Sequence, residues 1–214
     1  MTDRQQHWET VYRTKAPDAV SWYRPHLDTS LTLIERAAPD RGAAVLDVGG
    51  GASTLVDDLL ARGYRDLSVL DISTEALNVA RERLGEAADK VTWLADDLLD
   101  APLPQARYDL WHDRAVFHFL TEAGQRARYL RQLTRALKPA GHAVVATFGP
   151  QVPLKCSGLD TLRYDAQGLA RVLGDGLALL DSTLEFHATP FGTTQQFLCA
   201  LFRKTSSDTT GDLH

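Results

Sequence analysis

Short apolar runs alternate with amphipathic stretches through the middle of the chain. The apolar runs predict five strands, at residues 43–48, 67–72, 91–97, 108–113 and 142–149. The amphipathic stretches predict intervening helices at residues 53–63, 73–85 and 121–141. Pro139 and Gly141 close the last of these helices in this interpretation. Strands that alternate with helices form a parallel sheet covered on both faces, so the pattern predicts an α/β, doubly wound fold.

The pattern changes on both sides of this alternation. Before it, residues 3–13 and 26–37 predict two helices, and the prolines between them indicate a structured loop. After it, residues 163–174 predict a further helix, and residues 177–188 and 193–204 predict two strands. Because the turn that joins these two strands is short, we expect them to pair antiparallel.

The composition limits the classes of protein to consider. The 214 residues suit one domain, and 44% of them are hydrophobic, which is enough for a large core. Lysine and arginine are scattered and the formal net charge is −5, so nothing indicates a nucleic-acid partner. No apolar stretch is long enough to span a bilayer, and the polar N-terminus does not resemble a signal peptide. Cys156 and Cys199 lack metal-binding or redox spacing, so we expect a reduced, cytoplasmic protein without a metal site or membrane contact.

A glycine-rich turn, "VLDVGGGAST" at residues 45–54, follows the first predicted strand. Glycine permits a positive φ and lets a ligand approach the backbone, although a tight strand-to-helix turn alone also favours glycine. Asp71 lies 20 residues after Gly51, at the end of the second strand, where an acid can accept hydrogen bonds from ribose hydroxyls. The two features together indicate a ligand that contains a ribose.

Three features favour a cationic amino-acid nucleoside over a nicotinamide dinucleotide. Thr54 stands where the dinucleotide pattern has a third glycine or an alanine. Asp47 lies directly before the turn, where a carboxylate repels a pyrophosphate and attracts an ammonium group. Residues 95–98, "ADDL", offer acids near an adenine amine. S-adenosylmethionine fits this description, and an NAD(P)-dependent oxidoreductase stays open as a different class.

Five segments in order resemble the motifs of class I S-adenosylmethionine-dependent methyltransferases. These segments are "VLDVGGGAS", "VLDIS", "WLADDLLD", "YDLWHDRAVFHFL" and "LKPAGHAVVATF". Ser53 departs from the family, which usually has glycine there. The resemblance implies a Rossmann-like, seven-stranded sheet in the order 3-2-1-4-5-7-6, with the last strand antiparallel. It also implies a single methyltransferase domain over residues 1–204, with N-terminal helices and a lid in residues 1–40; we expect residues 205–214 to be a disordered tail.

The resemblance also implies which residues bind the cofactor. Asp47 would hold the amino group, Gly49 and Gly51 would bring the backbone against the methionine portion, and Asp71 would bind the ribose. The remaining cofactor-binding candidates are Trp22, Ile72, Asp96, Asp97, Leu98 and His112.

The methyl acceptor is expected beyond the fourth and fifth strands. A general base is needed only if the acceptor is protonated at the working pH. The catalytic candidates are Asp113, Arg114 and His118, although the first two could form an ion pair and the third could be a core residue. Phe117 and Phe119 are most simply core residues.

Other segments suggest the surroundings of the acceptor. The "HDRAVFHF" segment, a W-x-x-x-Y pattern within residues 7–12 and the "SWYRP" loop resemble, more loosely, thiopurine and some protein-lysine methyltransferase relatives. Trp22, Tyr23 and Arg24 are the expected lid residues, although Trp22 could instead pack the N-terminal helix onto the domain. The long loop at residues 148–164 contributes polar candidates: Lys155, Cys156 and Arg163.

The preferred function is therefore methyl transfer from S-adenosylmethionine to a small molecule, with S-adenosylhomocysteine as by-product. A protein-lysine or protein-arginine methyltransferase is the alternative. The sequence lacks the Asn/Asp-Pro-Pro-Tyr motif of base and glutamine methyltransferases, which argues against nucleic-acid amino groups. A non-catalytic protein that only binds the cofactor is a further class.

Overall fold

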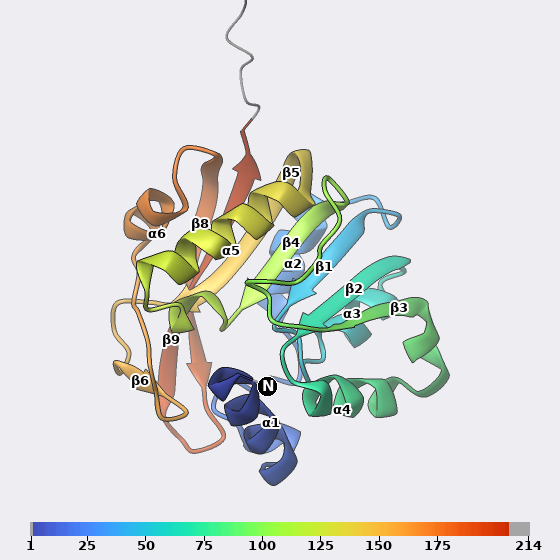
Figure 1. The fold of residues 1–214 in the computed structure, drawn as a ribbon, viewed down its shortest axis with the longest axis vertical. Coiled ribbons are helices and arrows are strands. Elements are labelled where there is room, and N and C mark those ends of the chain that lie inside the picture. Colours follow the sequence, from blue (N-terminus) through green and yellow to red (C-terminus); the bar gives the residue numbers. More distant parts are fainter. Residues whose placement is uncertain (1, 206–214) are drawn as a thin grey trace, which may run out of the picture.

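A computed structural model describes residues 2–205 of the chain, and seven strands in it form one sheet (Figure 1). The order across the sheet is β3-β2-β1-β4-β5-β9-β8, and β9 runs antiparallel to both of its neighbours. This confirms the predicted order and the antiparallel last strand. The strands are β1 (Ala44–Val48), β2 (Asp66–Asp71), β3 (Val91–Ala95), β4 (Tyr108–Arg114), β5 (Leu137–Phe148), β8 (Leu177–Ala188) and β9 (Thr194–Lys204).

Helices cover both faces of the sheet. The α-helices are α1 (Asp3–Thr14), α2 (Asp28–Ala37), α3 (Leu55–Ala61), α4 (Thr74–Leu84), α5 (Ala123–Ala136) and α6 (Ala166–Leu173). The 3₁₀ helices are η1 (Pro17–Ala19), η2 (Gly85–Lys90) and η3 (Phe117–Phe119). Because side chains alternate along a strand, β1 supplies Leu46 to the layer under α5 and α6 and Val45 to the layer under α2, α3 and α4. Helix α1 lies apart from both layers, beyond the ends of the central strands (Figure 1).

The predicted helix at residues 121–141 is too long. Helix α5 ends at Ala136, and the chain continues directly into β5 at Leu137. Pro139 has no N–H to donate and pushes Lys138 toward extended geometry, so the helix cannot continue. The pairing of β4 with β5 shifts register between Tyr108 and Leu110, where residues 138–141 are accommodated.

Two segments outside the sheet differ from the expectation. The predicted loop at residues 148–164 contains a small hairpin, β6 (Lys155–Cys156) paired with β7 (Leu159–Asp160). We expected Thr205 to lie in a disordered tail. It instead follows the last residue of β9 and donates its N–H to the Gly176 carbonyl at 3.0 Å. The rest of that tail, residues 206–214, lies outside the described residues. No helix within residues 2–205 combines the length and apolar character that crossing a membrane requires.

Candidate functional site

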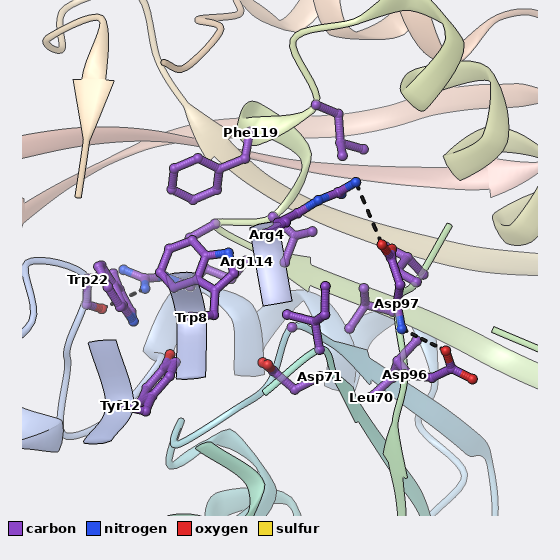
Figure 2. Close-up of a pocket in the computed structure, with 17 residues that line it drawn as sticks. Arg4, Trp8, Tyr12, Trp22, Leu70, Asp71, Asp96, Asp97, Arg114 and Phe119 are labelled. Carbon is purple, nitrogen blue, oxygen red and sulfur yellow. Dashed lines mark hydrogen bonds and ion pairs between the residues drawn. The ribbon is translucent and has the colours of Figure 1, made fainter. Parts of the chain in front are cut away.

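The carboxyl ends of β1, β2, β3 and β4 meet beneath α1 and surround two adjoining cavities, of which Figure 2 shows the larger. The larger has a volume of about 730 Å³ and the smaller about 510 Å³, each including its opening to solvent. Tyr12, Trp22, Gly49 and Arg114 line both cavities, so the two form one cleft.

The glycine turn after β1 forms one wall of the cleft and leaves no room for side chains. Gly49 has a φ of +64°, and a Cβ there would lie 2.0 Å from Cγ2 of Val116. A Cβ on Gly50 would lie 2.5 Å from Oδ2 of Asp47. The backbone is therefore bare, and a buried carboxylate lies directly against it. A pyrophosphate at this turn would meet that negative charge, which argues against a dinucleotide.

Asp47 is held in place by His112, which is itself held by Ser30. Its Oδ1 lies 2.7 Å from Nδ1 of His112, whose Nε2 lies 2.9 Å from Oγ of Ser30 on α2. Asp47 and His112 are register partners on β1 and β4, so the sheet itself brings them together. His112 lines the smaller cavity, and its contacts fix the orientation of the Asp47 carboxylate.

Asp71 ends β2 and has one carboxylate oxygen directed into the larger cavity. Its Oδ1 accepts a hydrogen bond from the N–H of Ser73 at 2.8 Å. The other oxygen faces Gly51, where an added Cβ would lie 2.9 Å from Oδ2 and 3.2 Å from the Tyr12 hydroxyl. Burial raises the pKa of Asp71 to about 7, and the nearby carboxylates of Asp47 and Glu9 add to the shift. The free oxygen is a ready acceptor for a ligand hydroxyl.

Glu9 attaches α1 to the start of α4, although the sequence did not single it out. Its buried carboxylate accepts hydrogen bonds from the Ser73 hydroxyl at 3.0 Å and from the backbone N–H groups of Thr74 at 2.8 Å and Glu75 at 3.2 Å. These are donors at the start of a helix, where a negative charge is stabilising. Ser73 also binds Asp71, so Glu9 ties α1 to the same segment that orients Asp71.

Replacing Glu9 with alanine is expected to detach α1 and weaken ligand binding. One buried and two partly buried donors lose their acceptor, which costs about 1–3 kcal/mol. Hydrogen exchange should therefore speed up across α1, and the affinity for S-adenosylhomocysteine should fall. Arg13→Ala is the matched control, because Arg13 reaches Glu75 on α4 only through an exposed contact of 3.8 Å. Equal effects of the two variants would show that Glu9 does not hold α1.

The end of β3 supplies the far wall of the larger cavity. Strand β3 ends at Ala95, so Asp96 and Asp97 lie in the turn and not in the strand. Oδ1 of Asp96 accepts the N–H of Asp97 at 2.8 Å, and Oδ2 of Asp97 lies 3.6 Å from Nη2 of Arg4. Ile72 and the buried Leu98 line the same cavity. The structure thus brings together the acids and apolar residues expected around an adenine.

Four rings cover the cleft, and we call them the aromatic roof: Trp8, Tyr12, Trp22 and Phe119. Ring centroids are 5.6 Å apart for Trp8 and Trp22, 5.3 Å for Trp8 and Phe119, and 6.4 Å for Tyr12 and Trp22. The rings come from α1, the 15–27 segment and η3 (Figure 2). Tyr23 and Arg24 line the smaller cavity. Phe117 is fully buried in the core, whereas Phe119 is only partly buried: it packs against the core and also lines the larger cavity.

Of the three catalytic candidates, only Arg114 reaches the cleft. Successive side chains of β4 point to opposite faces, so Arg114 and His112 face α2, whereas Asp113 faces α5. Asp113 is fully buried and accepts hydrogen bonds from the Tyr129 hydroxyl at 2.8 Å and the Val116 N–H at 3.1 Å. Burial raises its pKa to about 6. It lines neither cavity, and it does not pair with Arg114.

Replacing Asp113 with alanine is expected to affect stability more than binding. The variant leaves the buried hydroxyl of Tyr129 without its acceptor, which lowers the free energy of unfolding by about 1–3 kcal/mol. Urea denaturation measures this loss, and calorimetry should give an unchanged affinity for S-adenosylhomocysteine at a temperature where the variant is folded. A variant with unchanged stability and no turnover would instead point to a catalytic Asp113.

His118 also lies outside the linings of both cavities. Its ring is fully buried and stacks on Phe148, with centroids 4.0 Å apart. Burial, together with the nearby charge of Arg114, lowers its pKa to about 3, so the ring is neutral at neutral pH.

The polar residues of the 148–164 connection do not line the cleft either. Lys155 is exposed and lies 3.6 Å from Asp160, and Arg163 binds the Val152 carbonyl at 3.2 Å. Cys156 is buried, with its Sγ 3.8 Å from the Ser21 hydroxyl. These side chains stabilise the connection and its contact with the 15–27 segment.

Comparison with known proteins agrees with this geometry. Residues 45–141 match the family model described as "Methyltransferase domain". The eEF1A lysine and N-terminal methyltransferase of Mus musculus is 25% identical over 138 residues, which cover 64% of this chain and 19% of that protein. The chain spans only about a fifth of the first curated relatives that it matches.

Solved structures share the whole fold. One, described as "Conversion of a Disulfide Bond into a Thioacetal Group during Echinomycin Biosynthesis", has a TM-score of 0.74 at 21% identity and covers 96% of this chain and 94% of its own. The 1,6-didemethyltoxoflavin-N1-methyltransferase of Burkholderia thailandensis, with its substrate and S-adenosylhomocysteine bound, has a TM-score of 0.66 at 22% identity, with coverages of 84% and 78%.

The strand order is that of the class I S-adenosylmethionine-dependent methyltransferases, and the resemblance seen in the sequence is confirmed at the level of the fold and the family match. The family match itself covers residues 45–141, a little under half of the chain.

Proposed function

We propose that this chain binds S-adenosylmethionine in the cleft and transfers its methyl group to a small-molecule acceptor. One observation carries the proposal: two buried carboxylates, Asp47 and Asp71, flank a bare glycine turn beneath the aromatic roof. Asp47 suits an ammonium group, and Asp71 suits ribose hydroxyls. A ligand with both groups and a positive charge near the aromatic rings matches all three features.

The residues present fit this cofactor. Asp47 would hold the amino group, with its orientation maintained by His112, and the backbone at Gly49 would lie along the amino-acid chain. Asp71 would accept from the ribose through the oxygen that Ser73 leaves free. The adenine would lie in the larger cavity, which is lined by Ile72, Asp96, Asp97 and Leu98.

When bound, the cofactor supplies a methyl group already activated on a sulfonium. The chain has to orient the acceptor and exclude water. The aromatic roof does both, and its π faces favour a positive charge. Neither Asp113 nor His118 lines the cleft, so we propose neither as a general base.

A small acceptor is favoured because the cleft is covered. Helix α1 and the 15–27 segment lie across it, and Glu9 secures α1 by three hydrogen bonds. Among similar proteins, the toxoflavin enzyme is described with a small-molecule substrate and the eEF1A enzyme with a protein substrate. The cover over the cleft supports a small-molecule acceptor for this chain.

Two measurements test the proposal. Calorimetric titration should show binding of S-adenosylmethionine and S-adenosylhomocysteine but not of NADPH. A cell extract incubated with the protein and methyl-labelled cofactor should then carry label in the small-molecule filtrate. Binding of NADPH alone would contradict the cofactor assignment. Label confined to protein would contradict the small acceptor, and label in neither fraction would contradict the proposed methyl transfer.

A further inference from the structure

The guanidinium of Arg114 is buried at the junction of the two cavities and lacks a full set of partners. Its side chain is 7% exposed, and its Nη1 donates to the Trp22 carbonyl at 2.9 Å (Figure 2). Its Nη2 is buried and has no hydrogen-bond partner among residues 2–205. The guanidinium carbon lies 4.4 Å from the centre of the Phe197 ring. One donor group of a side chain that lines both cavities therefore lacks a hydrogen bond.

The acid nearest to Arg114 is shared with a second guanidinium. Glu185 Oε1 lies 3.6 Å from Nη2 of Arg114, but only 2.9 Å from Nη1 of Arg24. Although burial opposes ionisation, the hydroxyl of Thr29 and the two guanidinium charges hold the pKa of Glu185 below its ordinary value. Two cations thus share one carboxylate. Because a buried charge without a partner is costly, the group of three favours a further anion.

The other charges around the cleft are used elsewhere under the proposed function. Asp47 is assigned to the cofactor amine, Asp71 to the ribose, and Asp96 to the adenine amine. Arg114 lies on β4 among the rings of the aromatic roof, where the acceptor must approach. The charge left for the acceptor is positive, which disfavours a lysine ammonium group.

We infer that the methyl acceptor carries an anionic group, such as a carboxylate, that pairs with Arg114 beneath the aromatic roof. This inference rests on the proposed function, because it assumes that the cofactor occupies the acidic part of the cleft. A planar carboxylate matches the donor geometry of a guanidinium, and the surrounding rings suit an aromatic or unsaturated body. The same chemistry has a second possible source, the carboxylate of the cofactor itself, and the experiment separates the two.

The experiment uses benzoate and benzylamine, which share a ring and differ in charge. Each is titrated by calorimetry into the protein saturated with S-adenosylhomocysteine, whose own carboxylate is then already in place. Benzoate should bind more tightly than benzylamine. Arg114→Gln should weaken benzoate binding by about tenfold or more, as expected for loss of a charged hydrogen bond. Arg114→Lys, which keeps the charge, should retain part of the affinity.

The controls distinguish the possible failures. Arg114→Gln leaves Glu185 paired with Arg24, so we expect it to fold, and titrations of this variant with S-adenosylhomocysteine and 5′-methylthioadenosine show whether the cofactor site is affected. If it binds S-adenosylhomocysteine weakly but 5′-methylthioadenosine normally, the partner is the cofactor carboxylate and the inference is overturned. Equal binding of benzoate and benzylamine to the saturated parent chain would also overturn it. A parent chain that binds no S-adenosylhomocysteine would instead refute the proposed function.

Discussion

Changing Gly49 to alanine is expected to weaken binding of S-adenosylhomocysteine strongly. The added Cβ would lie 2.0 Å from Cγ2 of Val116, and the φ of +64° is one that side-chain-bearing residues rarely adopt. The backbone strain costs about 1–2 kcal/mol and the overpacking about 1–3 kcal/mol. Either Val116 or the turn must move, and both line the cleft. Calorimetry should show an affinity at least about 100-fold lower.

Gly63 offers a matched control for this variant. Its φ of +86° is also positive, but a Cβ there would meet nothing within 4 Å. Gly63→Ala therefore carries the backbone strain of about 1–2 kcal/mol without the steric overlap. It should lower the free energy of unfolding and leave the affinity for S-adenosylhomocysteine unchanged. If Gly49→Ala bound as well as Gly63→Ala, the turn would not be a wall of the ligand site.

Changing Asp71 to alanine is expected to weaken S-adenosylhomocysteine binding by about 1–3 kcal/mol, because the ribose hydroxyls lose a buried acceptor. That range corresponds to a factor of about 5–150 in the dissociation constant. Calorimetry at pH 8 measures it, since the carboxylate with a pKa of about 7 is then ionised. An unchanged affinity would show that the ribose does not bind at Asp71.

The raised pKa of Asp71 also predicts how stability depends on pH. The folded chain holds this proton up to about pH 7, whereas the unfolded chain releases it near 3.8. The contribution of Asp71 to the free energy of unfolding therefore falls as the pH rises between these values and then levels off. Its charged and polar neighbours are Asp47 on β1 and Glu9 and Tyr12 on α1. Asp71→Asn should remove this part of the slope and be more stable than the parent chain at pH 8.

Ligand affinity should change in the opposite direction. Ionised Asp71 accepts hydrogen bonds at both oxygens, so S-adenosylhomocysteine should bind more tightly as the pH rises through about 7. Asp71→Asn should lack this rise. An identical pH profile for the variant and the parent chain would mean that a different group controls binding.

The part of the site that follows directly from the parallel sheet was predictable. Carboxyl ends of parallel strands meet at one edge, so acids at the ends of neighbouring strands lie close together. Asp47, Asp71 and Asp96 could therefore be placed from their positions after apolar runs. A turn at the glycines was also predictable, but the sequence alone left open whether a ligand or the turn itself required Gly49, and the structure adds its positive φ and its close contact with Val116.

Contacts made by α1 could not be predicted in the same way. Glu9 binds residues 64 to 66 positions away, and no local pattern fixes where α1 docks. One signal was present, because Glu9 and Tyr12 are three residues apart and share a helix face. An acid on a buried helix face requires a donor, and the start of α4 supplies several.

The sequence also could not show which face of β4 points toward the cleft. Alternation along the strand separates Asp113 from Arg114, but only the packed structure shows which face is open. Helix α5 places Tyr129 against Asp113 and closes that face. Arg114 is left on the face toward α2, beside the cleft.

The most direct test of the account is a crystal structure of this chain with S-adenosylhomocysteine. We predict the ligand beneath the aromatic roof, with its ribose hydroxyls on Asp71, its amino group on the Asp47 side of the glycine turn, and its adenine between Ile72 and Leu98. A ligand bound elsewhere, or lying in the cleft with its ribose away from Asp71, would contradict the account.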